Sequence, residues 1–479
     1  MSPHADERAW DANALRIVHG LSLGLRASMW WPWWAGSTIL RMSPMSRGRK
    51  SKQGKANSGL RAAARRRTYG VRAGQPGSVA TAMASLLGPP QRPAWFDSST
   101  KAVLDRAAVV MAARAPRELE QATAELLGAE LYRVLREERG GLWFSWWFEE
   151  LTQAAMARIR EEVSGRDGGW EPAWRLLHGL TSIGSAALRS RARSALGRAK
   201  KELRGDVALQ RQPEWLRLLP RIRASGEVWE MRDAYGARIA LIAGFSYPDG
   251  VDPSVFLFDI DACGFVEIVH AGVFDDVQQA ATVWRTMVGD TAGGAQVERV
   301  ETADHLLCLV YCDSREDILR GSESRAVLDN WFRARCRIHD LADALRKRGM
   351  LLPVARSLYR DLDTDPMEEA FADWYVHRHG SEPDPEAVGA LALEWMEGTL
   401  PESWHAVSPH RVEFQLALIN DWIPDDPITI AAKALLPEWV RWHGEQAGLS
   451  EHLIDRGIAV ATGGVRSASD CVDLRVVES

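Results

Sequence analysis

"EVWEMRDAYGARIALIAGF" (residues 227–245) opens the part of the sequence that decides the fold. It holds two short apolar runs on either side of the turn sequence DAYG, and two more runs, VFLFDI (255–260) and FVEIVHAG (265–272), follow after SYPDGVDP. Short apolar runs broken by Gly, Pro, Asp and Ser are typical of β-strands joined by turns. A helical pattern comes next, at 276–288. We therefore predict a small central α+β unit at 226–315, with three or four antiparallel strands plus a helix.

Helical periodicity dominates the sequence on both sides of this unit. Before it, residues recur at steps of three and four behind Pro116, as on one buried helix face: Leu119, Thr123, Leu127, Leu131 and Val134. After it, a second seam of this kind comprises Val327, Trp331, Ala334, Ile338, Leu341 and Leu345. Two helix starts are marked by a capping residue before proline, at 408–409 and 426–427. The predicted fold class is therefore mainly α, with helical domains at 98–225 and 316–479.

The charge of the chain is unevenly distributed. Between Asp11 and Asp97 lie fourteen Arg and Lys residues and no Asp or Glu, whereas residues 97–479 carry a net charge of −17. From residue 45 to about 97 the chain is rich in Gly, Ser, Ala and Pro, so it cannot bury enough apolar surface to offset its ordering entropy. These features predict a disordered basic N-terminal arm at 45–97, attached to an acidic body.

Ten cations lie close together in this arm. They are Arg47, Arg49, Lys50, Lys52, Lys55, Arg61, Arg65, Arg66, Arg67 and Arg72. Blocks of like charge usually belong to interaction tails, and basic blocks attract phosphates. Tyr69 is the only aromatic residue near them, so base stacking would be minor and sequence selectivity poor. A milder basic group at 189–201 could add to the same attraction.

The charge pattern leads to an expected function and to an alternative. We expect a non-enzymatic, intracellular binding or regulatory protein whose arm contacts DNA or RNA non-specifically. The body of this protein would meet a protein partner or a second copy of the chain. Alternatively, the arm only keeps the chain in solution or folds back on the acidic body. The body repels phosphate, so any nucleic-acid contact would be confined to the basic segments.

The first 44 residues have an unusual composition. Four Trp residues surround Pro32, and the apolar run at 27–40 is shorter than the roughly 20 residues that span a bilayer. Arg26 and Pro32 interrupt the pattern that a signal peptide would need. Met45 begins the sequence MSRGRKSKQGK, a plausible start. We therefore expect residues 1–44 to be non-native upstream translation or disordered, and we expect no association with a membrane.

The bulk composition indicates an ordinary globular, cytoplasmic protein. Hydrophobic residues make up 46% of the chain and charged residues 26%. The five Cys residues, at no framework spacing, favour reduced thiols over a disulfide scaffold. Arg outnumbers Lys by 51 to 8, which is typical of a GC-rich bacterial genome. Phosphate-binding GxxxxGK[ST], GxSxG and HExxH motifs are absent from the sequence.

Tryptophan is abundant, with 21 residues. Several lie at helical separations, in the groups Trp143, Trp146 and Trp147, Trp170 and Trp174, and Trp439 and Trp442. Burying one such side chain removes roughly 150 to 250 Å² from water. We predict that these groups pack between helices or at a contact between subunits, rather than lining an aromatic ligand pocket.

Two groups of residues suggest metal chemistry. Cys308 and Cys312 fall on one side of either a helix or a strand, and Cys336 and His339 lie three apart on a helix flank. Four such ligands could bind zinc in a tetrahedron. The alternative is that these cysteines behave as small core residues, since HLLCLVYC reads as buried apolar sequence. No other cofactor is expected.

An HD dipeptide supports a second metal hypothesis. It is formed by His339 and Asp340, with His305 upstream and Asp361 or Asp373 downstream. This order resembles the metal-dependent HD phosphohydrolases over about seventy residues. The resemblance implies a metal-dependent hydrolase with its site between His305 and Asp373, and this is the alternative to a non-enzymatic binding protein.

Overall fold

The computed structural model of the chain describes eight stretches of the sequence. They are residues 92–137, 143–164, 169–204, 206–247, 253–264, 267–300, 325–348 and 362–464. Internal contacts divide the chain into Met1–Arg92 and Pro93–Ser479, and the description below concerns the second unit. No helix among the described residues is long and apolar enough to span a bilayer.

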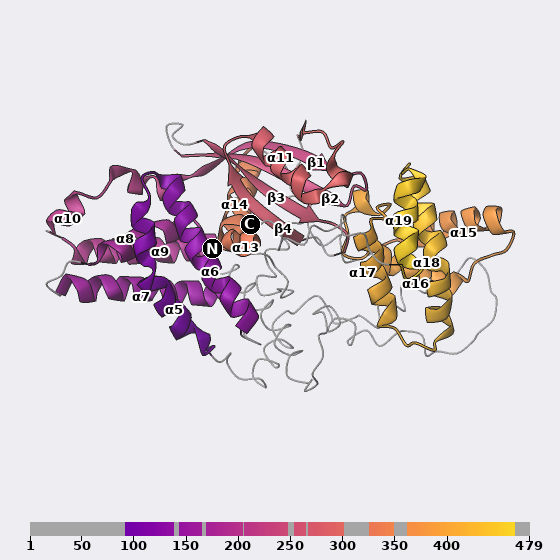
Figure 1. Ribbon diagram of the computed structural model, residues 1–479, viewed down its shortest axis with the longest axis horizontal. Helices are drawn as coiled ribbons and strands as arrows, with labels where there is room; N and C mark the ends of the chain where they lie inside the picture. Colours follow the sequence, from indigo (N-terminus) through magenta and orange to yellow (C-terminus); the bar gives the residue numbers. More distant parts are fainter. Residues whose placement is uncertain are drawn as a thin grey trace. The chain divides into compact units, whose positions relative to one another are not determined.

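A five-stranded antiparallel sheet forms the centre of this unit (Figure 1). Its spatial order is β4-β3-β2-β1-β5. The strands are β1 (Arg223–Arg232), β2 (Arg238–Ser246), β3 (Ser254–Asp261), β4 (Glu267–Phe274) and β5 (Glu298–Arg299). All residues of β3 are buried, as expected for a central strand covered on both faces.

The sequence predicted the first four strands and the helix after them, but not the fifth strand. β5 has only two residues, both exposed, which pair with Glu230 and Trp229 of β1. A short polar strand has no apolar alternation in its sequence, so it can be recognised only from the strand with which it pairs. The observed fold is mainly helical with a five-stranded sheet.

Helices cover the two faces of the sheet (Figure 1). On one face Trp284, Ala280 and Ala281 of α11 (Val277–Val288) contact Ile242 and Leu257. On the other face lies α14 (Trp331–Lys347), which follows α13 (Arg325–Asp329). Four residues of the predicted seam, Ala334, Ile338, Leu341 and Leu345, lie in the core beside Phe256 and Phe258. Of the other two, Trp331 is partly buried and Val327 belongs to α13. Successive side chains of β2 and β3 point to opposite faces of the sheet, so each face has its own hydrophobic core.

The helices that precede the sheet in the chain pack against one another as a first bundle. They are α5 (Trp95–Asp105), α6 (Pro116–Glu137), α7 (Phe144–Ser164), α8 (Glu171–Leu180), α9 (Ala186–Glu202) and α10 (Val207–Gln210). Short 3-10 turns are η1 (Ala107–Ala112), η2 (Glu214–Arg217) and η3 (Leu219–Arg221). Helix α6 begins at the proline predicted to start it, and all five residues of its predicted face are buried.

Helix α5 corrects the predicted end of the disordered arm. Residues 95–97, assigned to the arm at 45–97, are helical. Trp95 and Phe96 are 2% and 0% exposed. The ring of Trp95 lies 6.0 Å from that of Phe144 and 5.8 Å from that of Trp147. These partners are distant in sequence, so local composition could not reveal that the two aromatic residues belong to a core. Residues 45–91 of the arm lie outside the described residues.

A second helical bundle follows the sheet and α14. Its helices are α15 (Asp365–His379), α16 (Pro385–Met396), α17 (Pro409–Asn420), α18 (Pro427–Gln446) and α19 (Glu451–Ala461). The short turn η5 (Asp290–Ala292) precedes it in the chain, and η7 (Pro401–Ser403) lies between α16 and α17. Both predicted helix starts are confirmed, because Ser408 accepts a hydrogen bond from Arg411 N and Asp426 accepts one from Ile428 N.

The predicted burial of tryptophan is also confirmed. Six of the seven named side chains are buried, namely Trp143, Trp147, Trp170, Trp174, Trp439 and Trp442, and Trp146 is partly buried. They form aromatic clusters inside the bundles. Trp439, for example, contacts Phe371 at a ring separation of 4.8 Å and Trp395 at 6.4 Å. The helical spacing of these tryptophans therefore places them on the buried faces of their helices, where they pack against other aromatic rings.

Candidate functional site

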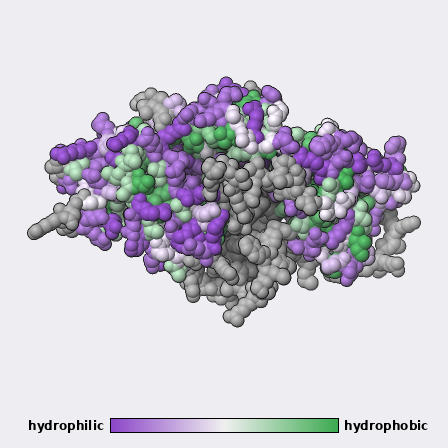
Figure 2. Space-filling model, viewed as in Figure 1, coloured by the Kyte–Doolittle hydropathy of each residue, from purple (hydrophilic) through white to green (hydrophobic). Residues whose placement is uncertain are grey.

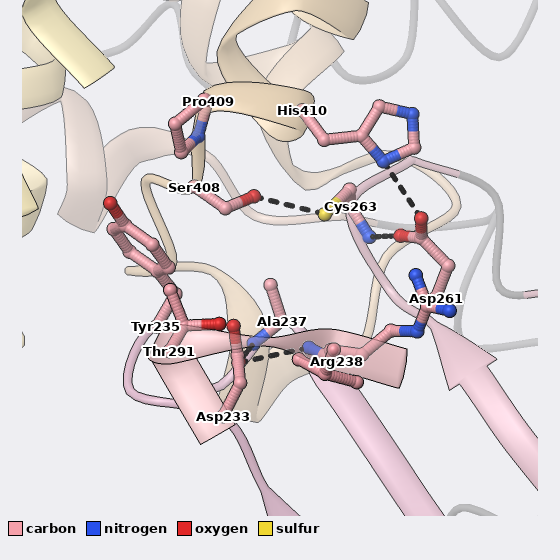
Figure 3. A pocket seen from close by; sticks show the side chains of 11 residues that line it. Asp233, Tyr235, Ala237, Arg238, Asp261, Cys263, Thr291, Ser408, Pro409 and His410 are labelled. Carbon is pink, nitrogen blue, oxygen red and sulfur yellow. Dashed lines mark hydrogen bonds and ion pairs between the residues drawn. The ribbon is translucent and has the colours of Figure 1, made fainter. Parts of the chain in front are cut away.

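A small polar cavity lies where the sheet meets the second helical bundle (Figure 3). Its volume is about 30 Å³. It is lined by the turn between β1 and β2, the residues just after β3, and the start of α17. A cavity of this size has room for a water molecule or a single ion.

Three metal-ligating side chains converge on this cavity. One oxygen of Asp261, the Sγ of Cys263 and a ring nitrogen of His410 all lie within 4.8 Å of one another. His410 Nδ1 is 2.7 Å from Asp261 Oδ2. Cys263 Sγ is 3.0 Å from the Oγ of Ser408, and its backbone N–H donates to Asp261 Oδ1 at 2.7 Å. Figure 3 shows the three side chains coming from two separate segments of the chain.

Local structure explains how these segments meet. Asp261 ends β3, and the next residue, Ala262, donates its N–H to Ala237 O, which turns the chain out of the sheet. Gly264 lies against the ring of Phe414 in α17, where a Cβ atom would come within 2.8 Å of that ring. Only a residue without a side chain permits this close approach. The approach brings the first turn of α17, and with it His410, beside Asp261.

Charged side chains form the floor of the site. Arg238 donates from Nε and Nη2 to the two oxygens of Asp259, at 2.6 and 2.8 Å. Asp259 is fully buried and also accepts from Trp284 Nε1 at 2.9 Å. On the side of the cavity away from His410 (Figure 3), Asp233 Oδ1 accepts from the backbone N–H groups of Ala237 and Arg238, at 2.9 and 3.0 Å. These hydrogen bonds tie the floor of the site to the sheet.

Burial controls the protonation of these groups. Burial alone would raise the pKa of Asp261, but the charge and hydrogen bond of His410, with Arg238, hold it below its usual value. Burial and the neighbouring carboxylate of Asp261 raise the pKa of the Cys263 thiol well above its usual value. Burial raises the pKa of Asp233 to about 6. Cys263 is therefore held as a thiol, which is a poor nucleophile.

The zinc ligands predicted from the sequence do not meet in the described part of the chain. Cys308 and Cys312 lie outside the described residues. Cys336 is buried in α14, where its Sγ donates to Ser182 O at 3.1 Å, and burial with Asp340 raises its pKa to about 12. His339 follows on the same helix, half-buried. In the described ranges, three potential ligands come together at Asp261, Cys263 and His410 and at no other place.

The residues of the HD hypothesis are likewise not assembled by the described structure. His305 and Asp361 lie outside the described residues. Asp340 accepts two hydrogen bonds from Arg189 of α9, and Asp373 lies on the exposed face of α15. Arg189 also belongs to the predicted milder basic group, so this ion pair removes one of its cations from solvent. The ten cations of the arm, from Arg47 to Arg72, lie outside the described residues too.

The sequence carried little sign of the Asp261, Cys263 and His410 site. A carboxylate and a thiol two residues apart at a strand end are a weak signal, and His410 stands among scattered histidines of the C-terminal region. One clue was present, since the predicted helix start at Ser408 and Pro409 places His410 in a first turn. Only the fold brings that turn to β3.

Comparisons with known proteins identify no relative. No protein-family model matches the chain, and neither the curated proteins nor the solved structures give a significant match.

Proposed function

We propose that this chain is a non-enzymatic binding protein of the bacterial cytoplasm, held on DNA or RNA by its basic arm. The observation that carries the proposal is the charge distribution, with fourteen Arg and Lys and no acidic residue between Asp11 and Asp97, against −17 for residues 97–479. The acidic body would then bind a protein partner or a second copy of the chain.

Physical chemistry favours attachment through phosphates. Each phosphate that a Lys or Arg neutralises releases condensed counterions, which makes the affinity strongly dependent on salt. The ten cations between Arg47 and Arg72 could engage six or more phosphates. With one aromatic residue, Tyr69, among them, contacts to bases would add little. The arm would therefore act as an unspecific tether.

The milder basic group of α9 adds four exposed cations to this attraction. Arg189 and Arg191 of α9 pair with Asp340 and Glu149. The remaining cations of that helix are exposed, namely Arg193, Arg198, Lys200 and Lys201. Most of the described surface visible in Figure 2 is hydrophilic, with hydrophobic residues in small separate groups. Residues 97–479 carry a net charge of −17, so we expect phosphate binding by the body alone to be weak.

The geometry of the cavity supports binding rather than catalysis. Its volume of about 30 Å³ suits a water molecule or a single ion, and burial raises the pKa of the Cys263 thiol beside it. The described cysteines, Cys263 and Cys336, are free thiols, in keeping with a reducing compartment.

Binding to labelled duplex DNA and to single-stranded RNA tests the proposal. The full chain is compared with a shortened chain that starts at Pro93, so that α5 and its buried Trp95 stay intact. We expect the affinity of the full chain to fall by about 10³ to 10⁵ between 50 and 200 mM salt. The shortened chain should bind at least tenfold more weakly at low salt, with a flatter salt dependence.

A second variant separates charge from chain length. In it the ten cations of the arm are replaced by Gln, and its salt dependence should match that of the shortened chain. Equal affinity and equal salt dependence of the full and shortened chains would overturn the proposal.

A further inference from the structure

We propose that Asp261, Cys263 and His410 bind one divalent transition-metal ion, with zinc as the ion that this donor set suits best. The geometric basis is the convergence of three ligand atoms within 4.8 Å of one another at the wall of a small cavity. This site uses no residue of the basic arm and does not depend on the proposed nucleic-acid contact.

The chemistry of the three donors selects the class of ion. A thiolate and an imidazole are soft or borderline ligands that favour zinc, cobalt and copper over magnesium or calcium. A carboxylate oxygen completes the donor set that borderline ions accept. Three protein ligands leave the fourth tetrahedral position open, and the cavity of about 30 Å³ has room for a water molecule there.

The charge around the cavity also fits a divalent cation. The site has five charged side chains, one of which, Asp261, is itself a ligand. Three are negative, Asp233, Asp259 and Asp261, and two are positive, Arg238 and Arg411. With His410 counted as the neutral imidazole that binds a metal, their sum is one negative charge. When Cys263 binds the ion its thiol proton leaves to solvent, which adds a second negative charge. A divalent ion then neutralises the site, as burial requires.

Ser408 is oriented to support the sulfur ligand. Its Oγ accepts the hydrogen bond from Arg411 N at 3.2 Å that begins α17. Its own O–H is then free to donate to Cys263 Sγ, 3.0 Å away. A hydrogen bond of this kind stabilises a thiolate and fixes its direction. Ser408 is therefore a positioning residue, and it acts through Cys263.

Binding needs only a small adjustment of the observed geometry. In a tetrahedral zinc site the nitrogen and oxygen ligands lie roughly 3.3 Å apart, whereas His410 Nδ1 and Asp261 Oδ2 are 2.7 Å apart. The ion would replace this hydrogen bond and widen the gap by about 0.6 Å. The side chain of His410 is 23% exposed at the first turn of a helix, so it can move by this amount.

Cobalt titration of the full chain, after removal of metal with a chelator, tests the proposal. Co²⁺ replaces zinc in such sites and shows a near-ultraviolet charge-transfer band when a thiolate binds it. We expect one equivalent to bind with this band and with the visible spectrum of a tetrahedral ion. Zinc should displace the cobalt, and elemental analysis should then find one zinc per chain.

Substitutions identify the ligands. Cys263→Ser should abolish the charge-transfer band, and His410→Ala should weaken cobalt binding at least tenfold while the band persists at saturation. Ser408→Ala should weaken binding roughly tenfold and shift the band, because it alters the environment of the sulfur. The thermal melting temperature of each variant without metal verifies that it folds. His410→Ala is the variant that should disturb folding least, since the side chain of His410 is partly exposed.

The chain provides matched controls among its other cysteines and histidines. Cys336→Ser, His339→Ala and the double change of Cys308 and Cys312 to Ser should leave the band and the affinity unchanged. The proposal is overturned if no thiolate band forms with the unaltered chain. It is also overturned if the band survives in folded Cys263→Ser, or disappears in one of the controls.

Discussion

Arg189 of α9 and Asp340 of α14 form a bidentate ion pair, with Nη2 2.7 Å from Oδ1 and Nη1 3.0 Å from Oδ2. The two side chains are 11% and 16% exposed. They lie 151 residues apart in the sequence, so the pair ties the helices before the sheet to the helix that covers one of its faces. The contact gives Asp340 a structural partner in Arg189.

Asp340→Asn tests this contact. The substitution keeps the shape of the side chain but removes its charge, leaving Arg189 with a poorer partner. We expect the free energy of unfolding to fall by about 1.5 to 3 kcal/mol, the range for hydrogen bonds to charged groups. Urea denaturation measures it. Asp343→Asn is the control, since Asp343 and Arg346 form an exposed pair, 62% and 52% exposed, and should change stability by less than about 0.5 kcal/mol. Equal effects of the two substitutions would contradict this assignment.

Gly128→Ala tests the close contact between α6 and α13. A Cβ atom at this position would lie 2.4 Å from the Cα of Asp329, so the two helix backbones would have to separate. Although Ala has the higher helix propensity, we expect a loss of about 1 to 3 kcal/mol from overpacking. Gly197→Ala, in the exposed middle of α9 with nothing within 4 Å, should instead add about 0.5 to 1 kcal/mol. Thermal melting of both variants would show opposite shifts, and shifts of the same sign would refute the predicted contact.

His178 makes the stability of the protein dependent on pH. Burial lowers its pKa from 6.5 to about 4, although the hydrogen bond between Nδ1 and Leu216 O, 3.1 Å long, opposes this effect. In the unfolded chain the imidazole takes up a proton below about pH 6.5, whereas in the folded chain it stays neutral down to about pH 4. The stabilisation is therefore complete above pH 6.5 and declines as the pH falls to 4, by about 3 kcal/mol.

Urea denaturation at pH 7.0, 5.5 and 4.5 would measure this decline. His443 is fully buried and burial lowers its pKa as well, so it acts in the same direction. A His178→Asn variant should consequently show a smaller loss of stability with acid than the unaltered chain, but not a complete absence of loss. A variant with the same dependence on pH as the unaltered chain would show that His178 does not contribute.

Trp147→Ala probes the aromatic cluster of the first bundle. Trp147 is fully buried against Trp95, and its Nε1 donates to Thr100 Oγ1 at 3.1 Å. We expect the truncation to lower the free energy of unfolding by about 3 to 5 kcal/mol. Thr100→Val removes only the hydrogen bond and should lower it by about 1 kcal/mol. If the two changes cost the same, packing of the ring would not be the main contribution.

The sequence predicted most helices and strands of the fold, but it did not predict the candidate metal site. The faces of α6 and α14 and the caps of α17 and α18 were predictable because each depends on residues within a few positions of one another. The strand β5 and the burial of Trp95 and Phe96 were not predictable from the sequence, because each depends on a partner elsewhere in the chain. Likewise, the cysteines chosen for zinc by their spacing did not include Cys263.

The sequence by itself therefore determined the local structure of this protein: helices from their apolar periodicity and caps, strands from short apolar runs between turns, and the charge split from composition. The tertiary structure alone decided that Cys263 meets Ser408 and His410, since the first two residues are separated by 145 positions. Apolar burial drives α17 against the end of the sheet without regard to which polar side chains it brings together. A cluster such as Asp261, Cys263 and His410 is a consequence of that packing and leaves no linear pattern.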